Sequence, residues 1–380
     1  MDCNRFSEID LSQIPTPCYL VDEIALERNL KILQKVQSES DGKVLLALKA
    51  FAMFSLFPMM REFLHGVCAS SAFEARLGKE EFGKQVQTYG PAYSSTDIEQ
   101  IIKYSDHIIF NSENQWLRHR NAIPESVKCG FRVNPEYSEI DIDLYDPCGT
   151  NSRLGMTLDS FPKNLDGITG LHFHALCEQN ADTLNRVINK VEEKFGHILK
   201  QMKWINLGGG HHITRQDYDL PLLIQSIRHL KEKYNLEVYL EPGEAVALNT
   251  GVLVSSVLDI VNNGMEIAIL DTSAEAHMPD VIAMPYRPDI IGAAQPGEYP
   301  HAYRLAGMTC LAGDVIGDYS FPHKLQIGDK LVFLDMAHYT MVKNNMFNGI
   351  NLPSIVVLTK ENKLKVIRQF SYSDYKSRLS

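Results

Sequence analysis

The chain has 380 residues, of which 44% are hydrophobic and 22% charged, and its formal net charge is −10. This length is enough for two domains, or for one barrel with an additional domain, and the composition is that of a globular protein. The acidic balance argues against nucleic acid as a main partner and suits a small or cationic ligand, and no apolar run approaches the roughly 20 residues that a membrane-spanning helix needs.

The N-terminus and the cysteines indicate the compartment. The first residues, MDCNRFSEIDLSQIP, lack the basic and apolar layout of a signal peptide. The seven cysteines are odd in number and scattered, without a Cys-x-x-Cys pair. This pattern favours a reducing cytoplasm over a disulfide framework. We therefore expect a soluble cytoplasmic protein without a membrane segment.

The first predicted elements are a strand and a helix. Residues 16–22, TPCYLVD, open on a proline turn and predict a short strand. Residues 23–37 show helical spacing. The candidates for the buried stripe of this helix are Ile24, Leu26, Leu30, Leu33 and Val36.

Residues 44–50, VLLALKA, predict a strand buried on both faces, because five apolar residues run directly into Lys49. A lysine at a strand end usually extends its amine into water. A lysine that is held in a pocket can instead form a Schiff base. The segment alone leaves both interpretations open.

Apolar strands then recur at regular intervals. With VLLALKA they number about eight, the others being 66–70, 86–90, 107–111, 128–134, 168–174, 204–210 and 238–243. Amphipathic segments separate most of them, among them 95–104, 181–200 and 218–234. This alternation predicts a (β/α)8 TIM barrel. A doubly wound open sheet is the alternative, but no Gly-x-Gly-x-x-Gly follows the first strand.

Two other stretches bear on the organisation of the chain. The loop at 135–156 is long and polar, and such loops are often functional. After about residue 248 helical periodicity fades and short β-branched runs appear, at 252–261, 267–270, 330–334 and 354–358. These runs predict a second, mostly antiparallel β domain of sandwich or barrel type. The expected division is a barrel at 23–248 and a β domain made of 1–22 and 249–380.

Chemically reactive residues lie at the carboxyl ends of the predicted barrel strands, where barrels of this kind carry their chemistry. These residues are Lys49, His172, His174, Gly208, Gly209, Gly210 and Glu241. The set fits pyridoxal 5′-phosphate. Lys49 would attach the cofactor and Glu241 would pair with its pyridine nitrogen. The glycines would turn backbone N–H groups toward its phosphate, and His174 could stack on its ring.

Each of these signals is weak when it stands alone. Glu-Pro-Gly is most often a turn, and three glycines are most often a flexible loop. The two histidines alternate on one strand, so one of them can simply be a hydrogen-bonded core residue. Their joint placement at one rim makes the stronger case.

The whole chain resembles the fold-type III pyridoxal-phosphate-dependent decarboxylases, the group of ornithine, arginine and diaminopimelate decarboxylases that is related to alanine racemase. Within this group it is most similar to the carboxynorspermidine/carboxyspermidine decarboxylase branch. The matching motifs span roughly residues 16–349 and read LALKA, CASSAFEA, NSRLG, GLHFHALCEQ, NLGGGHHIT, LEPGEA, DTSAEAHMPD, MPYRP, GMTCLAGD and YTMVKNNMFNG.

The resemblance implies a carboxy-lyase that converts carboxynorspermidine, carboxyspermidine or both to norspermidine or spermidine in polyamine biosynthesis. It also implies an obligate homodimer with shared active sites. Cys310 would then donate a proton in the partner's site, Tyr339 would contact the cofactor phosphate, and Arg153 would help hold the rim between subunits.

A cationic polyamine substrate should also meet carboxylates. The acidic candidates are Glu275, Asp280 and Asp314, each of which could equally be a solvated surface acid.

Three positions depart from the pattern of the broader family. Glu244 stands where an arginine usually follows Glu-Pro-Gly, although the carboxynorspermidine branch shares this EPGEA. Cys68 replaces an aspartate, and Leu311 replaces an acidic residue. The last two changes argue against ornithine or diaminopimelate as the preferred substrate.

Other functions stay open at this point. One is a decarboxylase of a basic amino acid (diaminopimelate, ornithine or arginine), and another is an amino-acid racemase. A third is a non-catalytic pyridoxal-phosphate-binding protein, although proteins of that kind lack a C-terminal β domain. A metal-dependent barrel hydrolase could use His172, His174, Cys177, His211 and His212. Such hydrolases usually place His-x-His on the first strand, whereas it falls here on about the sixth, so we expect no metal.

Overall fold

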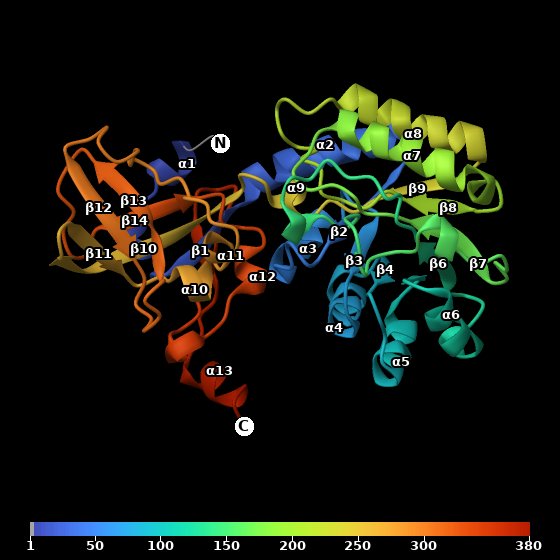
Figure 1. Cartoon of the computed structure of the whole chain (residues 1–380). Helices are drawn as coiled ribbons and strands as arrows, with labels where there is room; N and C mark the ends of the chain where they lie inside the picture. The colour runs from blue at the N-terminus through green and yellow to red at the C-terminus, as the bar shows by residue number, and fades with distance from the viewer. Residues whose placement is uncertain (1–3) are drawn as a thin grey trace. The chain divides into compact units, whose positions relative to one another are not determined.

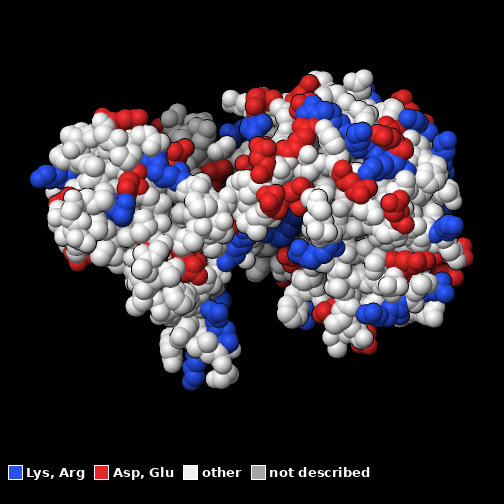
Figure 2. All heavy atoms as spheres, viewed as in Figure 1, with Lys and Arg blue, Asp and Glu red and all other residues white. Residues whose placement is uncertain are grey.

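The computed structural model describes residues 4–380. The chain divides into two compact units, one of residues Glu27–Val246 and one of residues 4–26 with Ala247–Ser380. Among the described residues, no helix combines the length and the apolar character needed to cross a membrane. On the face shown in Figure 2, acidic and basic side chains are interspersed over the surface of both units.

The unit of residues Glu27–Val246 is a closed barrel of parallel strands, β2 to β9 (Figure 1). Its strands are β2 Lys43–Ala47, β3 Gly66–Ala69, β4 Gln85–Tyr89, β5 His107–Phe110, β6 Lys128–Arg132, β7 Ile168–His172, β8 Trp204–Asn206 and β9 Glu237–Leu240. β9 pairs with β2 and closes the barrel. The (β/α)8 prediction is confirmed, and every strand begins within one residue of its predicted start. The strands end earlier than predicted, because the residues beyond them leave the ladder and form the loops of one mouth.

Helices alternate with these strands, except between β6 and β7, where the connection holds only short 3-10 turns. The helices are α2 Glu23–Ser40, α3 Phe57–Met60, α4 Ala72–Leu77, α5 Ser95–Tyr104, α6 Glu113–His119, α7 Ala181–Leu199, α8 Leu220–Tyr234 and α9 Glu244–Ala247. Serine hydroxyls cap α4, α5 and α6 by accepting a backbone N–H of the first turn, which satisfies a donor that the helix leaves open.

One residue of the stripe predicted for α2 faces solvent. Leu26, Leu30, Leu33 and Val36 are fully buried, whereas Ile24 is 44% exposed. Ile24 lies two residues before Leu26, and at about 100° of rotation per residue it falls on the opposite face of the helix.

The interior of the barrel is filled by side chains. Leu45, Ile109, Trp204 and Tyr239 form a buried cluster inside it. A Cβ on Gly170 would lie 2.0 Å from the Trp204 indole, so glycine is required there for the indole to fit. The barrel is therefore a packed core with two separate mouths, as is usual for this architecture.

The second unit is a sheet of eight strands. They are β1 Cys18–Asp22, β10 Gly251–Asn262, β11 Glu266–Leu270, β12 His301–Ala306, β13 Val315–Phe321, β14 Lys330–Leu334, β15 Ser354–Leu358 and β16 Leu364–Arg368. Their order is β13-β12-β11-β10-β1-β15-β16, and β14 also pairs with β10.

Most pairs in this sheet are antiparallel, as predicted, and only β1–β15 and β11–β12 are parallel among the described strands. The early strand β1 belongs to this sheet through β10 and β15. Short helices decorate the unit, namely α1 Asn4–Ser7, α10 Ala274–His277, α11 Asp280–Ala283, α12 Thr340–Lys343 and α13 Tyr372–Ser377.

Candidate active site

Lys49 lies at the mouth of the barrel formed by the carboxyl ends of the strands. β2 ends at Ala47, and the chain then turns, with the Ala50 N–H donating to the Ala47 carbonyl. The turn releases Lys49 from the strand ladder, and its side chain is exposed at the mouth. An amine in this position is available for attachment to a ligand.

Glu241 follows β9 and is held by side chains from two neighbouring strands. His172 Nε2 lies 3.2 Å from Glu241 Oε2, and Asn206 Nδ2 donates to Glu241 Oε1 at 2.6 Å. Burial raises the pKa of Glu241, but His172, Asn206 and the Lys49 ammonium together outweigh burial, so that the pKa is lowered. Glu241 is therefore an ionised carboxylate at neutral pH, although only 11% of its side chain is exposed.

His172 is the hydrogen-bonded core histidine of the His-x-His pair. Burial lowers its pKa, so the ring is neutral at pH 7 and donates its Nε2 proton to Glu241. The Tyr89 ring stacks on it with centroids 5.3 Å apart, and the Arg132 guanidinium lies 4.5 Å from the Tyr89 centroid. This stack fixes the imidazole that orients Glu241.

His174 stands against the glycine loop that follows β8. The Gly209 N–H donates to His174 Nδ1 at 3.2 Å, and Arg132 Nη2 donates to the His174 carbonyl at 3.2 Å. Burial, with Lys49 and Arg132 as further causes, holds the pKa of His174 well below its usual value. The ring is therefore neutral and can stack on an aromatic ligand without adding charge.

The loop of Gly208, Gly209 and Gly210 needs glycine. Gly208 and Gly210 have φ of +71° and +84°, and a Cβ on Gly210 would lie 1.8 Å from the Leu176 carbonyl. The Gly208 and Gly209 N–H groups donate to Asn206 Oδ1 at 2.8 Å and to His174 Nδ1 at 3.2 Å. An anion such as a phosphate at this bend would therefore meet the bare backbone and the Gly210 N–H.

Two further predicted positions flank this mouth. Arg153 is exposed in the loop after β6, and its carbonyl accepts from Asn111 Nδ2 at 2.8 Å. Glu244, the residue that replaces the family's arginine, lies 3.2 Å from His212 Nε2. Its carboxylate therefore lies beside the His212 ring.

In the second unit, three of the motif segments converge. The backbone N–H of Cys310, whose side chain is exposed, donates to Asn348 Oδ1 at 2.7 Å. Asn345 Nδ2 donates to the Glu275 carbonyl at 3.1 Å. The thiol of Cys310 and the segment of Glu275 are thus both fastened to the stretch that follows Tyr339.

Tyr339 itself has φ of +54°, which a non-glycine residue rarely adopts and which often accompanies function. The ammonium of Lys343 lies 5.3 Å from its ring centroid and donates to Asp280 Oδ1 at 2.5 Å.

Asp314, a candidate for binding a substrate amine, is surrounded by hydrogen-bond donors of the chain itself. Asp314 is 3% exposed, and its carboxylate accepts from the Ser273 hydroxyl, the Ala274 N–H, and both the N–H and the hydroxyl of Thr309. These donors tie α10 to the Cys310 loop. The structure therefore favours a positioning role for Asp314 over direct binding of a substrate amine.

The histidines considered for a metal site have separate partners. His172 meets Glu241, His174 meets Gly209, His211 Nδ1 lies 2.5 Å from the Tyr218 hydroxyl, and His212 faces Glu244. Among residues 4–380, no three His, Cys, Asp or Glu side chains are arranged to hold a metal ion.

Sequence reasoning missed Asn206, Tyr89 and Arg132. Arg132 is a charged residue at the end of an apolar strand, which is the same signal that singled out Lys49. Asn206 lies two residues before Gly208, and its amide also donates to Gln87 Oε1 at 2.8 Å. The strand period of two could have placed Asn206 inside the barrel, but its link to Glu241 depends on the pairing of β8 with β9.

The residues at this mouth fit pyridoxal phosphate. An exposed amine, a buried ionised carboxylate, a neutral ring and a bend of bare glycine backbone all follow the strands of one barrel end. Each matches one part of the cofactor, namely its aldehyde, its pyridine nitrogen, its ring face and its phosphate.

Comparison with known proteins agrees with this geometry. The family model described as pyridoxal-dependent decarboxylase, C-terminal sheet domain, matches residues 18–337. The chain is 47% identical to a carboxynorspermidine/carboxyspermidine decarboxylase of Campylobacter jejuni over 96% of this chain and 99% of the relative. It is 45% identical to a carboxyaminopropylagmatine decarboxylase of Synechocystis over 97% of this chain and 96% of the relative.

A solved structure of carboxynorspermidine decarboxylase from C. jejuni, complexed with norspermidine, superposes with a TM-score of 0.91 at 46% identity, covering 96% of this chain and 100% of that one. With the barrel, the sheet and the residues of the mouth, these likenesses lead to one conclusion: the chain belongs to the pyridoxal-dependent decarboxylases and takes pyridoxal phosphate as its cofactor.

Proposed function

We propose that this protein decarboxylates carboxynorspermidine, carboxyspermidine or both, releasing norspermidine or spermidine in polyamine biosynthesis. The observation that carries the proposal is the full-length likeness to the C. jejuni enzyme, whose structure was solved with norspermidine. The likeness to the Synechocystis enzyme supports a second candidate substrate, carboxyaminopropylagmatine.

Residues of the barrel mouth would hold the cofactor and set its charge. Bound pyridoxal phosphate supplies an electron sink for the electron pair left when CO2 departs. Lys49 would attach it covalently through the ε-amine. Glu241, kept ionised by His172 and Asn206, would hold a proton on the pyridine nitrogen.

Other residues would place the phosphate and handle the proton. The glycine loop 208–210, through its bare backbone and the Gly210 N–H, and the hydroxyl of Tyr339 would bind the phosphate, while His174 would lie on the ring face. Cys310 would donate its thiol proton to the carbon that has lost CO2. Its exposure and its fixed backbone support this role.

The cationic chain of the substrate needs acidic contacts. Glu275 and Asp280 are our candidates for its amines, with Arg153 at the rim. Asp314 would act through Glu275 and Cys310, since its hydrogen bonds join the loops that carry them. Lys343 already compensates the charge of Asp280, so Asp280 would exchange this partner when substrate binds.

We further propose that the protein acts as a cytoplasmic homodimer with shared active sites, and that residues 23–248 serve as the cofactor-binding domain, with 1–22 and 249–380 as the second domain. The scattered cysteines support a cytoplasmic location. The two compact units have their boundaries between residues 26 and 27 and between residues 246 and 247, close to the proposed domain limits.

A substrate panel tests the proposal. CO2 release by the purified enzyme is measured with carboxynorspermidine, carboxyspermidine, carboxyaminopropylagmatine, diaminopimelate, ornithine and arginine, and Lys49→Ala serves as the inactive control. We expect kcat/KM for a carboxylated triamine to exceed that for the three amino acids at least tenfold, about 1.4 kcal/mol in transition-state binding. A tenfold preference for any of the amino acids would overturn the proposal, and a preference for carboxyaminopropylagmatine would select the second candidate.

A further inference from the structure

A second polar region lies at the opposite mouth of the barrel, where the strands begin. Lys43, Gln85, His107 and Lys128 are the first residues of β2, β4, β5 and β6. With Tyr239 of β9 they line a hollow of about 360 Å3. This volume lies within the range of roughly 300–1,000 Å3 that is usual for small-molecule sites. The proposed decarboxylation uses none of these residues.

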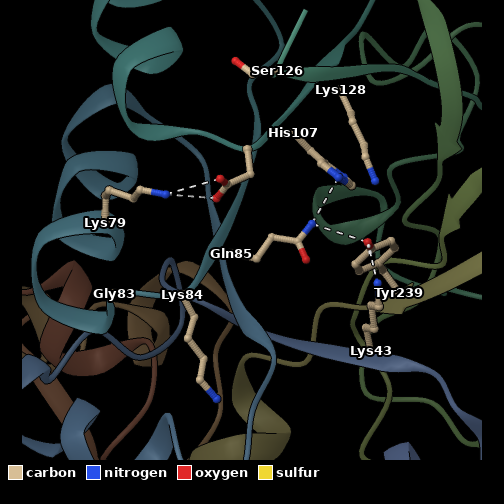
Figure 3. A pocket seen from close by; sticks show the side chains of 10 residues that line it. Lys43, Lys79, Gly83, Lys84, Gln85, His107, Ser126, Lys128 and Tyr239 are labelled. Atoms are coloured by element: carbon tan, nitrogen blue, oxygen red, sulfur yellow. Dashed lines mark hydrogen bonds and ion pairs between the residues drawn. The ribbon is translucent and has the colours of Figure 1, made fainter.

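Positive charge exceeds negative charge around this hollow. Four lysines line it, at positions 43, 79, 84 and 128. Two carboxylates oppose them: Glu237 lies 3.1 Å from Lys43 and 3.9 Å from Lys128, and Asp106 lies 3.3 Å from Lys79. Four cations against two anions leave an excess of two positive charges. Lys84 donates to the carbonyls of Arg61 and Leu64, and Figure 3 shows its amine directed away from those of Lys43 and Lys128, so it contributes at longer range.

Neutral donors complete the lining. Figure 3 shows the Lys43 and Lys128 amines grouped with His107, Gln85 and Tyr239. The Gln85 amide donates to His107 Nε2 at 3.1 Å and to the Tyr239 hydroxyl at 3.4 Å. His107 therefore carries its proton on Nδ1, which is buried and has no hydrogen-bond partner among residues 4–380. Gln85, His107 and Tyr239 thus form a hydrogen-bonded row beside the Lys43 and Lys128 amines.

We propose that this hollow binds a phosphate-type oxyanion, either free inorganic phosphate or diphosphate or the phosphate groups of a nucleotide. The excess of two positive charges, the lysine ammonium donors and the volume suit a polyvalent anion. The site is separate from the cofactor mouth, because the Trp204 and Tyr239 side chains fill the barrel between them.

Calorimetric titration of the pyridoxal-phosphate-loaded enzyme tests the proposal, since the loaded cofactor keeps its own phosphate cradle filled. The probes are inorganic phosphate, inorganic diphosphate, ADP and sulfate, at about 50 mM salt so that screening is limited. We expect one diphosphate site per chain. Preference for ADP over diphosphate would identify a nucleotide as the source of the phosphate groups, and preference for diphosphate a free anion.

The variant Lys43→Gln/Lys128→Gln should bind diphosphate at least tenfold more weakly. The matched control Lys31→Gln/Lys190→Gln removes the same charge from outer helices and should bind as the wild type does. Lysine acetylation of the wild-type enzyme gives a measurement without substitutions: diphosphate should slow labelling of Lys43 and Lys128 but not of Lys31. Absence of binding by all four probes, equal weakening in the control, or unchanged labelling would each overturn the proposal.

Discussion

At the scale of single residues, the charge of Glu241 depends on its neighbours. Without compensating contacts, a carboxyl buried this deeply would take up a proton, because burial disfavours the charged form. The N–H groups of His172 and Asn206 and the positive charge of Lys49 reverse that tendency. Glu241, kept ionised by these neighbours, would then hold a proton on a pyridine nitrogen placed against it.

Glu241→Gln keeps the shape of the side chain and removes its charge. We expect the loaded variant to retain visible absorbance but to lose activity by a hundredfold or more. The pyridinium charge of the cofactor would lose its partner, and a buried charge left alone costs about 3 kcal/mol. Steady-state kinetics and absorbance measure the two effects. The control is Glu232→Gln, on the exposed face of α8, which should behave as the wild type. Full activity in Glu241→Gln would contradict the role given to Glu241.

The sequence reveals some of these residues and hides others. Lys49 and Glu241 are visible because each interrupts or ends an apolar strand, and strand ends converge in a barrel. Asn206 is hidden, because its bond to Glu241 joins residues 35 positions apart whose neighbourhood depends on strand register. Asp314 could be a surface acid as far as the sequence goes, and only the structure shows that it is buried among backbone and hydroxyl donors.

At the scale of secondary-structure elements, β7 and β8 show how the barrel core is packed. Gly170 lies directly beside the indole of Trp204, and Trp204 Nε1 donates to the hydroxyl of Thr169 on the same strand as Gly170. The large indole on β8 is thus accommodated by the bare glycine backbone on β7.

Gly170→Ala should therefore destabilise the protein. The new methyl group would overlap the indole, and overpacking of this kind costs about 1–3 kcal/mol or more. Urea denaturation followed by circular dichroism measures the change. Gly196→Ala, inside α7 with its nearest neighbour at 3.2 Å, should be nearly neutral, because alanine favours a helix. If both variants unfold at the same urea concentration, the packing argument fails.

The barrel strands could be predicted because each is an apolar run bounded by turns. Strands β12, β13 and β16 escaped prediction. β12 and β16 mix charged with apolar residues, and β13 is interrupted by Gly317, Asp318 and Ser320, so none of them is a continuous apolar run. β12 is also held by a parallel partner, β11, far from it in sequence. Pairing over such distances follows from the sheet as a whole and leaves little local signal.

At the scale of the whole molecule, the proposed dimer makes a sharp prediction. Lys49 and Cys310 belong to different units of the chain. If Cys310 serves the partner's site, Lys49→Ala and Cys310→Ala should each be inactive alone. After mixing and reassociation, about a quarter of the wild-type activity should return, because about half of the dimers are mixed and each of these has one intact site.

Each variant reassociated with itself is the control for this experiment. Native mass spectrometry distinguishes the mixed dimer from the two homodimers by mass. If mixed dimers form and remain inactive, each site is built from a single chain.

Acid should destabilise the fold through its buried histidines. Burial lowers the pKa of His107 and of His211 to about 3. In the unfolded chain these rings accept protons below about pH 6.5, whereas the folded protein keeps them neutral. Their contribution is therefore fully present above pH 6.5 and is lost as the pH falls toward 3, by about 1.4 kcal/mol per pH unit for each ring.

Denaturant unfolding at pH 7.5, 5.5 and 4.5 measures this loss. His211→Gln should show a smaller fall in the free energy of unfolding than the wild type, while a substitution of the exposed His197 should leave the fall unchanged. A wild-type stability that is constant over this range would contradict the assignment of neutral, buried rings.

The indole of Trp204 also has a kinetic consequence. Since the axis of the barrel is blocked, CO2 and the shortened amine have no exit at the far end and must leave past Lys49, by the same route that the next substrate takes inward. The product amine and the next substrate cannot occupy that route at the same time. Norspermidine should accordingly inhibit competitively, raising the apparent KM and leaving kcat unchanged.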